Sequence, residues 1–399
     1  MGLRLIIYTG KGGTGKTVTS CSTAIKLAKK GLNAVVISAD PAHTLSDAFL
    51  VPDIGNDPKR IIMGLYALQL DPVVEMNKHY SSIISHMASI FSSKGIDETL
   101  AYEVAMLPGM TQLFSLLKIN EIMQSKTFEY IILDMPASGE ALRYLYFPKL
   151  VGSIGRKLSG IAAMFTEISR ILRPFSKNLN PSRSLFQHEG ALLETLDSLS
   201  ETIRNQDICS LRLVANPDTF SIENAKRALI SASLYGINVD LAIINKVMPS
   251  QVADQFYNEW SRFQRSKVEE AKANFYPIPT KEVNLHNSEL RGLDMLERNA
   301  EQLFGSDDPS RIFYLGKPIH FKTEGSTVSM SVKVPFTEKD DFDIERYGDQ
   351  LSIKVKSTAG YLVNVIPLPI VTIGMRLVKA TLRDDELKIL FDRNGSTNP

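Results

Sequence analysis

The sequence feature that most constrains this chain is a glycine-rich run near its N-terminus, GKGGTGKT at residues 10–17. A strand pattern at residues 3–8 precedes it, and a helical pattern follows it to residue 30. Phosphate-binding loops of the form G-x-x-x-x-G-K-[ST] occur in this strand, loop, helix order. Glycines let backbone N–H groups turn inward around phosphates, and the helix start adds its positive dipole end. We therefore predict an ATP site formed by Gly10, Lys11, Gly12, Gly13, Thr14, Gly15, Lys16, Thr17 and Val18.

Four side chains are candidates for the chemistry of ATP hydrolysis. Lys16 is expected to reach the β and γ phosphates, and the Thr17 hydroxyl to ligate Mg2+. Asp40 follows the strand pattern at residues 34–39 and is a candidate to orient or polarise the attacking water. The alternative role for Asp40 is an N-cap of the next helix. Asp134 follows the apolar run YIIL and is expected to hold a water molecule of the Mg2+ shell.

Short apolar runs alternate with helical patterns along most of the chain. The strand-like runs lie at residues 3–8, 34–39, 66–70, 130–133, 211–215, 241–244 and 275–278. This alternation predicts an α/β fold, a P-loop NTPase with a mostly parallel sheet covered by helices. We assign residues 1–305 to this ATPase domain, with helical insertions at about 73–124 and 141–207.

A change of pattern after residues 307–309 predicts a second domain at residues 310–393. Alternating apolar and polar residues, broken by charged or glycine turns, are typical of an all-β sandwich. Residues 394–399 are expected to be a flexible tail. The segments LSIKV at 351–355, IPLP at 366–369 and LRDDELKIL at 382–390 resemble the α-crystallin domain of small heat-shock proteins. This domain either docks a client or partner, for which strand addition offers a mechanism, or only buries ATPase surface.

Composition argues against several classes of function. Lys plus Arg total 45 against 44 Asp plus Glu, so no charge bias favours nucleic acid or an anionic membrane. The two cysteines, Cys21 and Cys209, are far apart and form no CxxC, so we expect no zinc site. The most apolar stretch, residues 361–375, contains prolines and is too short to span a bilayer, so no stable membrane insertion is expected. A reducing, cytoplasmic compartment fits this cysteine usage best.

Two motifs resemble the ArsA/GET family of ATPases, which includes arsenite-pump subunits and targeting factors for tail-anchored proteins. The loop GKGGTGKT is similar to the deviant Walker A form with its second lysine, and DPAHTLSDAF at residues 40–49 is similar to a long box of that family. The resemblance implies a homodimer that closes over Mg-ATP, with Lys11 crossing to the partner's nucleotide. It also implies an adenine pocket formed by Asn245 and by the loop of Pro277, Ile278 and Pro279; outside the family context, an Asn at a strand end is usually a turn former.

Departures from the family pattern bear on function. Residues 134–143, DMPASGEALR, stand where the family has D-x-A-P-T-G-H-x-L-R, with Glu140 in place of His. The cysteine pairs that bind zinc in some members, and the cysteine cluster that binds arsenite in others, have no counterpart. Apolar residues at helical spacing near 106–117 and 154–172 form either a client groove or ordinary core.

The sequence therefore predicts an ATP-driven dimeric switch that binds and releases a hydrophobic protein client, such as a membrane-protein segment. One alternative is the ATPase subunit of an anion or arsenite pump. Another is a chaperone-like binding module whose nucleotide is mainly structural.

Overall fold

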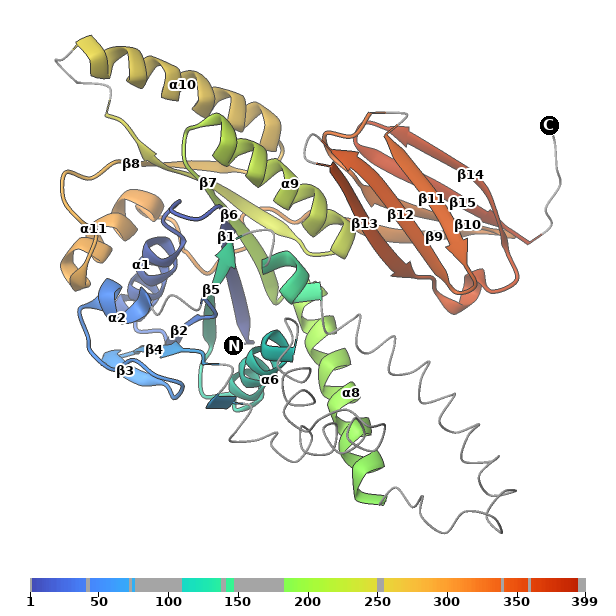
Figure 1. The fold of residues 1–399 in the computed structure, drawn as a ribbon, viewed down its shortest axis with the longest axis horizontal. Coiled ribbons are helices and arrows are strands. Elements are labelled where there is room, and N and C mark those ends of the chain that lie inside the picture. The colour runs from blue at the N-terminus through green and yellow to red at the C-terminus, as the bar shows by residue number, and fades with distance from the viewer. Residues whose placement is uncertain are drawn as a thin grey trace, which may run out of the picture.

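The computed structural model describes residues 2–40, 44–71, 74–75, 110–137, 141–146, 183–249, 255–338, 341–357 and 360–393. A helix-covered, mostly parallel sheet is followed by a β-sandwich, which confirms the predicted fold class (Figure 1). Four parts of the prediction lie outside the described residues: most of the insertions, residues 138–140 of the DMPASGEALR motif, the apolar segment 154–172 and the tail 394–399. Within the described ranges, no helix has the length and apolar character to cross a membrane.

The larger sheet has eight strands in the order β3-β4-β2-β5-β1-β6-β7-β8. Its strands are β1 Arg4–Gly10, β2 Ala34–Ser38, β3 Lys59–Ile62, β4 Leu65–Gln69, β5 Tyr130–Ala137, β6 Cys209–Ala215, β7 Val239–Val247 and β8 Thr280–Asn284. All neighbours are parallel except β3 and β4. Helices bury the central strands from both sides, which explains why these strands are continuous apolar runs in the sequence.

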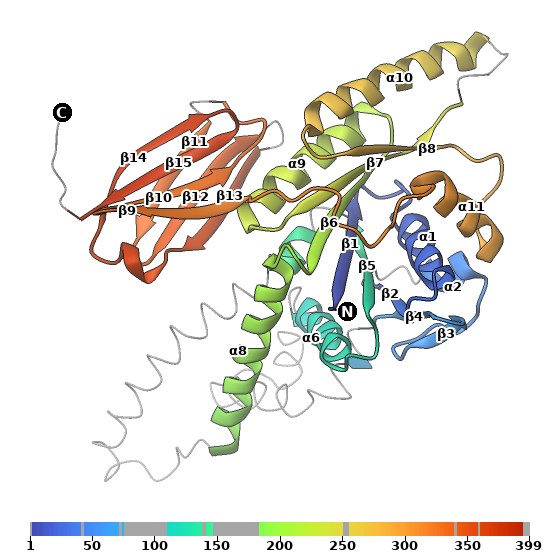
Figure 2. The same ribbon diagram turned by 180° about the vertical axis from the view of Figure 1, so that it is seen from behind.

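Helices cover both faces of this sheet, as the opposite views in Figures 1 and 2 show. On one face lie α1 Lys16–Lys29, α2 Thr44–Phe49 and α11 Gly292–Phe304. On the other lie α6 Met110–Gln124, α8 Arg183–Arg204, α9 Thr219–Tyr235 and α10 Gln255–Phe275. Parallel strands end at one edge of the sheet, and there Tyr8 of β1 and Ser38 of β2 both pair in register with Asp134 of β5. This edge brings the phosphate loop and Asp134 together.

The strand predicted at residues 275–278 is wrong. Helix α10 extends to Phe275, and the strand begins only at Thr280. Phe275 and Ile278 are apolar because both join the core on the α9 and α10 face, so burial rather than strand alternation explains the pattern. The predicted adenine loop, residues 277–279, therefore comes before the first residue of β8 and not after a strand.

The C-terminal sandwich pairs a four-stranded sheet, β14-β15-β10-β9, with a three-stranded sheet, β11-β12-β13. Its strands are β9 Ile319–Glu324, β10 Thr327–Lys333, β11 Phe342–Tyr347, β12 Gln350–Ser357, β13 Gly360–Pro367, β14 Arg376–Arg383 and β15 Glu386–Asp392, with a short 3-10 helix at Ile370–Thr372. Alternate residues of β10, Val328, Met330 and Val332, are fully buried in its core. All pairs are antiparallel, as an all-β sandwich requires.

Helix α9 belongs to both domains. It begins where the Asp218 carboxylate accepts a 2.9 Å hydrogen bond from the Ser221 amide, and it ends at Gly236, whose φ of 76° suits glycine. Its Ile230 and Leu234 side chains join the buried apolar cluster of the sandwich. The sandwich therefore packs on α9 as one continuous core (Figure 2).

Polar contacts fix the same junction. The Asn364 side-chain amide donates to the carbonyl oxygen of Leu234, and the Tyr146 hydroxyl donates to the carbonyl oxygen of Val365 at 2.5 Å. The rings of Tyr146 and Tyr235 stack with their centroids 4.3 Å apart. These bonds involve the backbone of β13 and α9, so the sandwich has a defined orientation on the ATPase domain.

The segment that links the two domains is held by buried arginines. Arg212 of β6 is fully buried and its Nε lies 3.2 Å from Oδ1 of Asp240. Its Nη2 donates to the carbonyl oxygen of Pro309 at 2.8 Å, while Arg4 Nε donates to that of Ser310 at 2.9 Å. Two charged side chains of the sheet thus bind the linker backbone.

Candidate nucleotide and metal site

Glycine is required at two points of the phosphate loop. A Cβ atom at Gly10 would lie 2.0 Å from the carbonyl oxygen of Val214, so only glycine allows β1 to pass β6 this closely. Gly15 has a φ of 92°, and a Cβ atom there would lie 2.3 Å from Nδ2 of Asn245. The loop therefore depends on close approach to strands β6 and β7, which the linear motif alone does not reveal.

Side chains from the end of β7 hold the carbonyl groups of the loop. Asn245 Nδ2 donates to the carbonyl oxygen of Thr14 at 2.8 Å, and Lys246 Nζ donates to that of Gly13 at 2.8 Å. Within the loop, the Thr14 hydroxyl donates to the carbonyl oxygen of Lys11 at 2.8 Å. The Thr14 N–H donates to the Lys11 carbonyl oxygen at 3.3 Å, while the N–H groups of Gly13 and Gly15 have no backbone acceptor among the described residues and can serve an anion. The role of Lys246 was not predicted; its position directly after Asn245 is the only sequence signal for it.

The predicted metal ligands lie together. Thr17 Oγ1 donates to Asp134 Oδ2 at 2.6 Å and lies 3.3 Å from the hydroxyl of Thr44. Asp134 is fully buried, and its second oxygen, Oδ1, has no hydrogen-bond partner among the described residues. Burial raises the pKa of Asp134 to about 7, while the Thr17 hydrogen bond and the charge of Lys16 act to lower it.

This donor set fits Mg2+. A hydroxyl and a carboxylate with an unused buried oxygen are hard oxygen donors, and Mg2+ prefers such donors while it retains several waters. Thr17 would bind the ion directly and Asp134 through water, and the ion would neutralise phosphate charge when bound. No group of three or more His, Cys, Asp or Glu side chains gathers as a metal site within the described residues. The expected lack of zinc stays a prediction.

A cavity of about 540 Å3 opens beside the loop. Lys16, Thr17, Asp40 and Asn245 all line it, so the structure brings these four predicted residues around one space. Gly12, Gly13, Gly15, Val18, Thr44 and Lys246 complete the phosphate side. The backbone of Asp40 is fixed, because its carbonyl oxygen accepts a 2.8 Å hydrogen bond from the Gln69 side chain.

The far side of this cavity differs from the prediction. It is formed by the last residue of β8 and the segment after it, which supply Asn284, Leu285, His286, Ser288, Glu289, Leu290 and Arg291. Nε2 of His286 is buried and has no hydrogen-bond partner among the described residues. Since β8 runs parallel to β7, its carboxyl end, and not its start, lies beside Asn245.

The loop of Pro277, Ile278 and Pro279 precedes β8 and lies at the opposite end of that strand. Pro277 and Ile278 line a different cavity, between the two domains. Their assignment to an adenine pocket is therefore corrected. Asn245 keeps its place at the nucleotide cavity, and the segment at residues 284–291 replaces the proline loop opposite it.

Lys11 is placed differently from Lys16. Lys16 is 7% exposed and lines the cavity, whereas the exposed Lys11 does not line it. The Lys11 ammonium lies 5.5 Å from the centroid of the Phe220 ring, and Phe220 is itself 76% exposed. Lys11, the additional lysine of the deviant Walker A form, therefore lies outside the cavity beside its own loop.

A phosphate loop at the start of a mostly parallel sheet, with a Thr and Asp pair suited to Mg2+, defines a P-loop ATPase. The chain belongs to the anion-transporting ATPase family (ArsA ATPase), whose sequence profile matches residues 3–305, and it is an ATPase. A second profile, the HSP20-like domain found in ArsA, matches residues 325–391. These matches confirm both family resemblances seen in the sequence.

Several relatives are similar over much of their length. An arsenical pump-driving ATPase of Chlorobaculum tepidum is 30% identical over 400 residues, covering 98% of this chain and 96% of the relative. One of Aquifex aeolicus is 29% identical over 402 residues, covering 98% and 100%. The ATPase get3 of Sclerotinia sclerotiorum is 28% identical over 313 residues, covering 75% of this chain and 89% of the relative. The first two relatives thus span both domains.

Proposed function

We propose that this chain is a Mg-ATP-dependent homodimeric switch that binds and releases a hydrophobic protein client in the cytoplasm. The position of Lys11 is the observation that carries the proposal. Its ammonium lies outside its own nucleotide cavity, which Lys16 already supplies with a positive charge. Phosphoryl transfer depends mainly on positioning and charge neutralisation, so an outward lysine beside the loop suits a nucleotide held by a second copy.

The path from the metal site to the apolar insertion supports the client-binding part. Asp134 lies on β5, and residues 141–146 further along the chain form a helical segment that is buried except for Arg143. Residues 154–172 lie a little further along the sequence and contain four Ile, two Leu, one Met and one Phe at helical spacing. An apolar helix face of this kind can pack against an apolar client segment. Loss of the γ phosphate at the metal site would therefore act on the segment that precedes this stretch.

The names of the two bacterial relatives favour a second candidate, the ATPase subunit of an arsenical pump. The cysteines of this chain do not support a thiol site for a metalloid. Cys21 and Cys209 are both buried and belong to the cores on opposite faces of the sheet. Burial also raises the pKa of both thiols, which disfavours the thiolate that a soft metalloid requires.

The switch is tested by measuring ATP turnover for the wild type, Lys16→Ala and Asp40→Asn, together with the mass in solution with and without ATP. We expect both variants to lose turnover and the wild type to be dimeric with ATP. Unchanged turnover in Asp40→Asn would remove that residue from the mechanism. A wild type that stays monomeric with ATP would exclude the homodimer.

The client is tested with a photo-crosslinking peptide that carries an apolar helix of about 20 residues, the length of a membrane span. We expect crosslinks that depend on the nucleotide, and a scrambled peptide with a charge in each turn serves as the control. Arsenite is added to the turnover assay in parallel. Stimulation by arsenite without peptide crosslinking would favour the pump subunit instead.

A further inference from the structure

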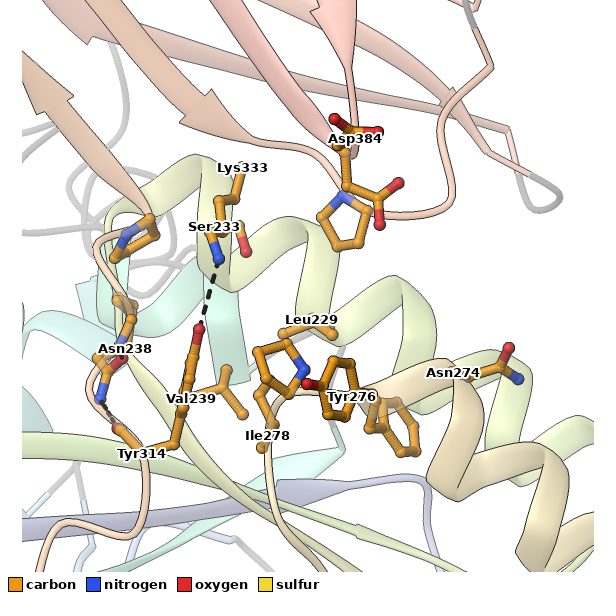
Figure 3. Close-up of a pocket in the computed structure, with 17 residues that line it drawn as sticks. Leu229, Ser233, Asn238, Val239, Asn274, Tyr276, Ile278, Tyr314, Lys333 and Asp384 are labelled. Carbon is orange, nitrogen blue, oxygen red and sulfur yellow. Dashed lines mark hydrogen bonds between the residues drawn. The ribbon is translucent and has the colours of Figure 1, made fainter.

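A second cavity, of about 410 Å3, lies between the two domains. Helix α9, the start of β7 and the residues after α10 form one side of it, while the linker, the end of β10 and the β14–β15 turn form the other (Figure 3). None of its lining residues lines the nucleotide cavity. Its volume lies within the range of small-molecule sites, roughly 300–1,000 Å3.

The base of this cavity is apolar. Leu229, Val239 and Ile278 lie together there from three different elements, α9, β7 and the segment before β8 (Figure 3). Tyr314 stands beside them, and Tyr276, which is 83% exposed, lies at the opposite side. An apolar base with aromatic side chains suits a flat or aromatic ligand group.

Tyr314 is held in place at both ends. Its carbonyl oxygen accepts a 2.9 Å hydrogen bond from the side chain of Asn238, and Oδ1 of Asn238 accepts one from the Gly316 amide at 3.0 Å. The Lys333 ammonium donates to the Tyr314 hydroxyl at 3.4 Å, as the dashed line in Figure 3 marks. The backbone of Tyr314 is therefore fixed by Asn238, and its hydroxyl is in contact with the Lys333 ammonium.

Three charged residues line the cavity, Lys333, Asp384 and Asp385, and two carboxylates with one ammonium give a net charge of −1. The aspartates occupy the β14–β15 turn, which the bond from the Val334 amide to the carbonyl oxygen of Asp385 ties to β10. Neither carboxylate forms an ion pair with another residue in the described part of the chain. The Lys333 ammonium bonds the Tyr314 hydroxyl on the linker side of the cavity, whereas the two carboxylates lie at the β14–β15 turn, so the cavity has a cationic side and an acidic side.

We propose that this cavity binds an organic cation with an apolar, aromatic body. The aromatic group lies on Leu229, Val239 and Ile278 beside Tyr314, and the cationic group faces Asp384 and Asp385. Carboxylates attract the cation directly, and the tyrosine rings pack against the aromatic body of the ligand. The ligand contacts both domains at once. The site is independent of the nucleotide switch, because the two cavities share no residue.

Three fluorine-labelled probes of similar size test the charge preference of the full-length protein by fluorine NMR titration. They are 2-(4-fluorophenyl)ethylammonium, 2-(4-fluorophenyl)ethanol and 3-(4-fluorophenyl)propanoate. We expect the cation to bind most tightly and the anion most weakly. Equal binding of the three, or tighter binding of the anion, would overturn the proposal.

Matched variants locate the site. Asn adopts a positive φ nearly as readily as Asp, so the double change Asp384→Asn with Asp385→Asn preserves the turn, whose φ angles are 49° and 60°. We expect it to weaken cation binding by about two- to tenfold, as exposed ion pairs predict. Lys333→Met removes the positive charge that lines the cavity, so we expect it to strengthen cation binding. A variant that merely misfolds would bind the cation less tightly, so this gain cannot come from a loss of structure.

Two controls complete the design. Asp53→Asn removes an exposed aspartate with a φ of 54° near β3, at the other edge of the sheet, and should leave cation binding unchanged. Lys16→Ala should lose ATP turnover but still bind the cation, which separates this proposal from the proposed switch. Cation affinity that ignores the Asp384 and Asp385 change, or that falls equally with Asp53→Asn, would refute the site.

Discussion

The hydroxyl of Thr17, at the start of α1, donates a 2.6 Å hydrogen bond to Oδ2 of Asp134, on strand β5. The two residues are 117 positions apart, yet the parallel register of β1 and β5 places them at one edge of the sheet. Because the Asp134 carboxyl is fully buried with its other oxygen unused, the pair is poised for a cation and costly to ionise without one.

Magnesium dependence should therefore vary with pH. The pKa of Asp134 is raised to about 7 by burial, so below that pH its carboxyl is protonated and a poor partner for the ion shell. We expect the Mg2+ concentration for half-maximal turnover to rise as the pH falls from about 8 to about 6. Asp134→Asn should raise the Mg2+ concentration for half-maximal turnover about ten- to a hundredfold. It should also remove the pH trend, because Asn does not titrate.

The same carboxyl should affect stability in the absence of metal and nucleotide. The folded protein retains the proton up to about pH 7, whereas the unfolded chain loses it near 4, so stability contributed by this group falls as the pH rises between these values. Thermal unfolding measured across that window should show Asp134→Asn gaining on the wild type as the pH rises. A difference that does not change with pH would contradict the assigned burial effect.

Mixing two inactive variants tests whether Lys11 acts across a dimer. In a mixed dimer of Lys11→Ala with Lys16→Ala, the first subunit keeps its own Lys16 and receives an intact Lys11 from the second. We therefore expect turnover of the mixture to exceed that of either variant alone. If Lys11 serves its own site, the mixture should stay as inactive as its components. Lys11→Ala in both subunits is the reference.

Glycine changes in the loop should separate by position. Gly10→Ala places a Cβ atom 2.0 Å from the carbonyl oxygen of Val214, so we expect it to lose about 1–3 kcal/mol of unfolding free energy. Gly12→Ala meets nothing within 4 Å and should have little effect on the nucleotide-free protein. Chemical denaturation without nucleotide distinguishes the two. Equal losses would mean that β1 and β6 approach less closely than described.

Nucleotide affinity should respond to the segment after β8. His286 lines the cavity with an unpartnered buried Nε2, so His286→Ala is expected to weaken ATP binding by about two- to tenfold. Pro277→Ala, at the opposite end of the strand, should leave affinity unchanged. Titration with a fluorescent ATP analogue measures both. The reverse result would restore the proline loop as the base-binding element.

The buried arginine under the linker should be essential for stability. Arg212→Met leaves the fully buried Asp240 with Arg4, at 3.5 Å, as its ion-pair partner, so we expect a loss near the lower end of the about 3–5 kcal/mol typical of a broken buried pair. Combining it with Asp240→Leu should recover part of that loss, because the buried carboxylate is removed and Arg4 keeps its hydrogen bonds to the carbonyl oxygens of Ile208 and Ser310. Denaturant unfolding of the single and double variants checks this. An additive double variant would show that the two side chains do not interact.

Local motifs made the phosphate side of the site predictable. Gly10 to Thr17 are contiguous, and Asp134 ends an apolar run, so each could be placed on its element without long-range information. The parallel sheet then follows from the alternation of strands and helices, and its shared edge gathers these residues. Asn245 came from the family resemblance, and the structure places it at the same cavity.

The remaining parts depend on geometry that the sequence does not display. Phe275 and Ile278 are as apolar as a strand, but one ends a helix and the other packs into the core, so the predicted adenine loop was assigned to the wrong end of β8. Lys246 itself has a φ of 60° and bonds the carbonyl oxygen of Gly13, and a lysine in the sequence does not indicate such a backbone conformation. The pairing of Arg212 with Asp240 joins neighbouring strands and could be seen only once β6 and β7 were aligned.

Because α9 contributes side chains to the cores of both domains, it affects how the two domains unfold on heating. Its Ile230 and Leu234 side chains are interior residues of the sandwich, and Arg4 and Arg212 bind the connecting backbone. A chain that ends at residue 305 would expose the apolar face of α9 to water, and this exposed face would favour aggregation. We therefore expect the ATPase domain and the sandwich to unfold together as one cooperative unit, in a single calorimetric peak.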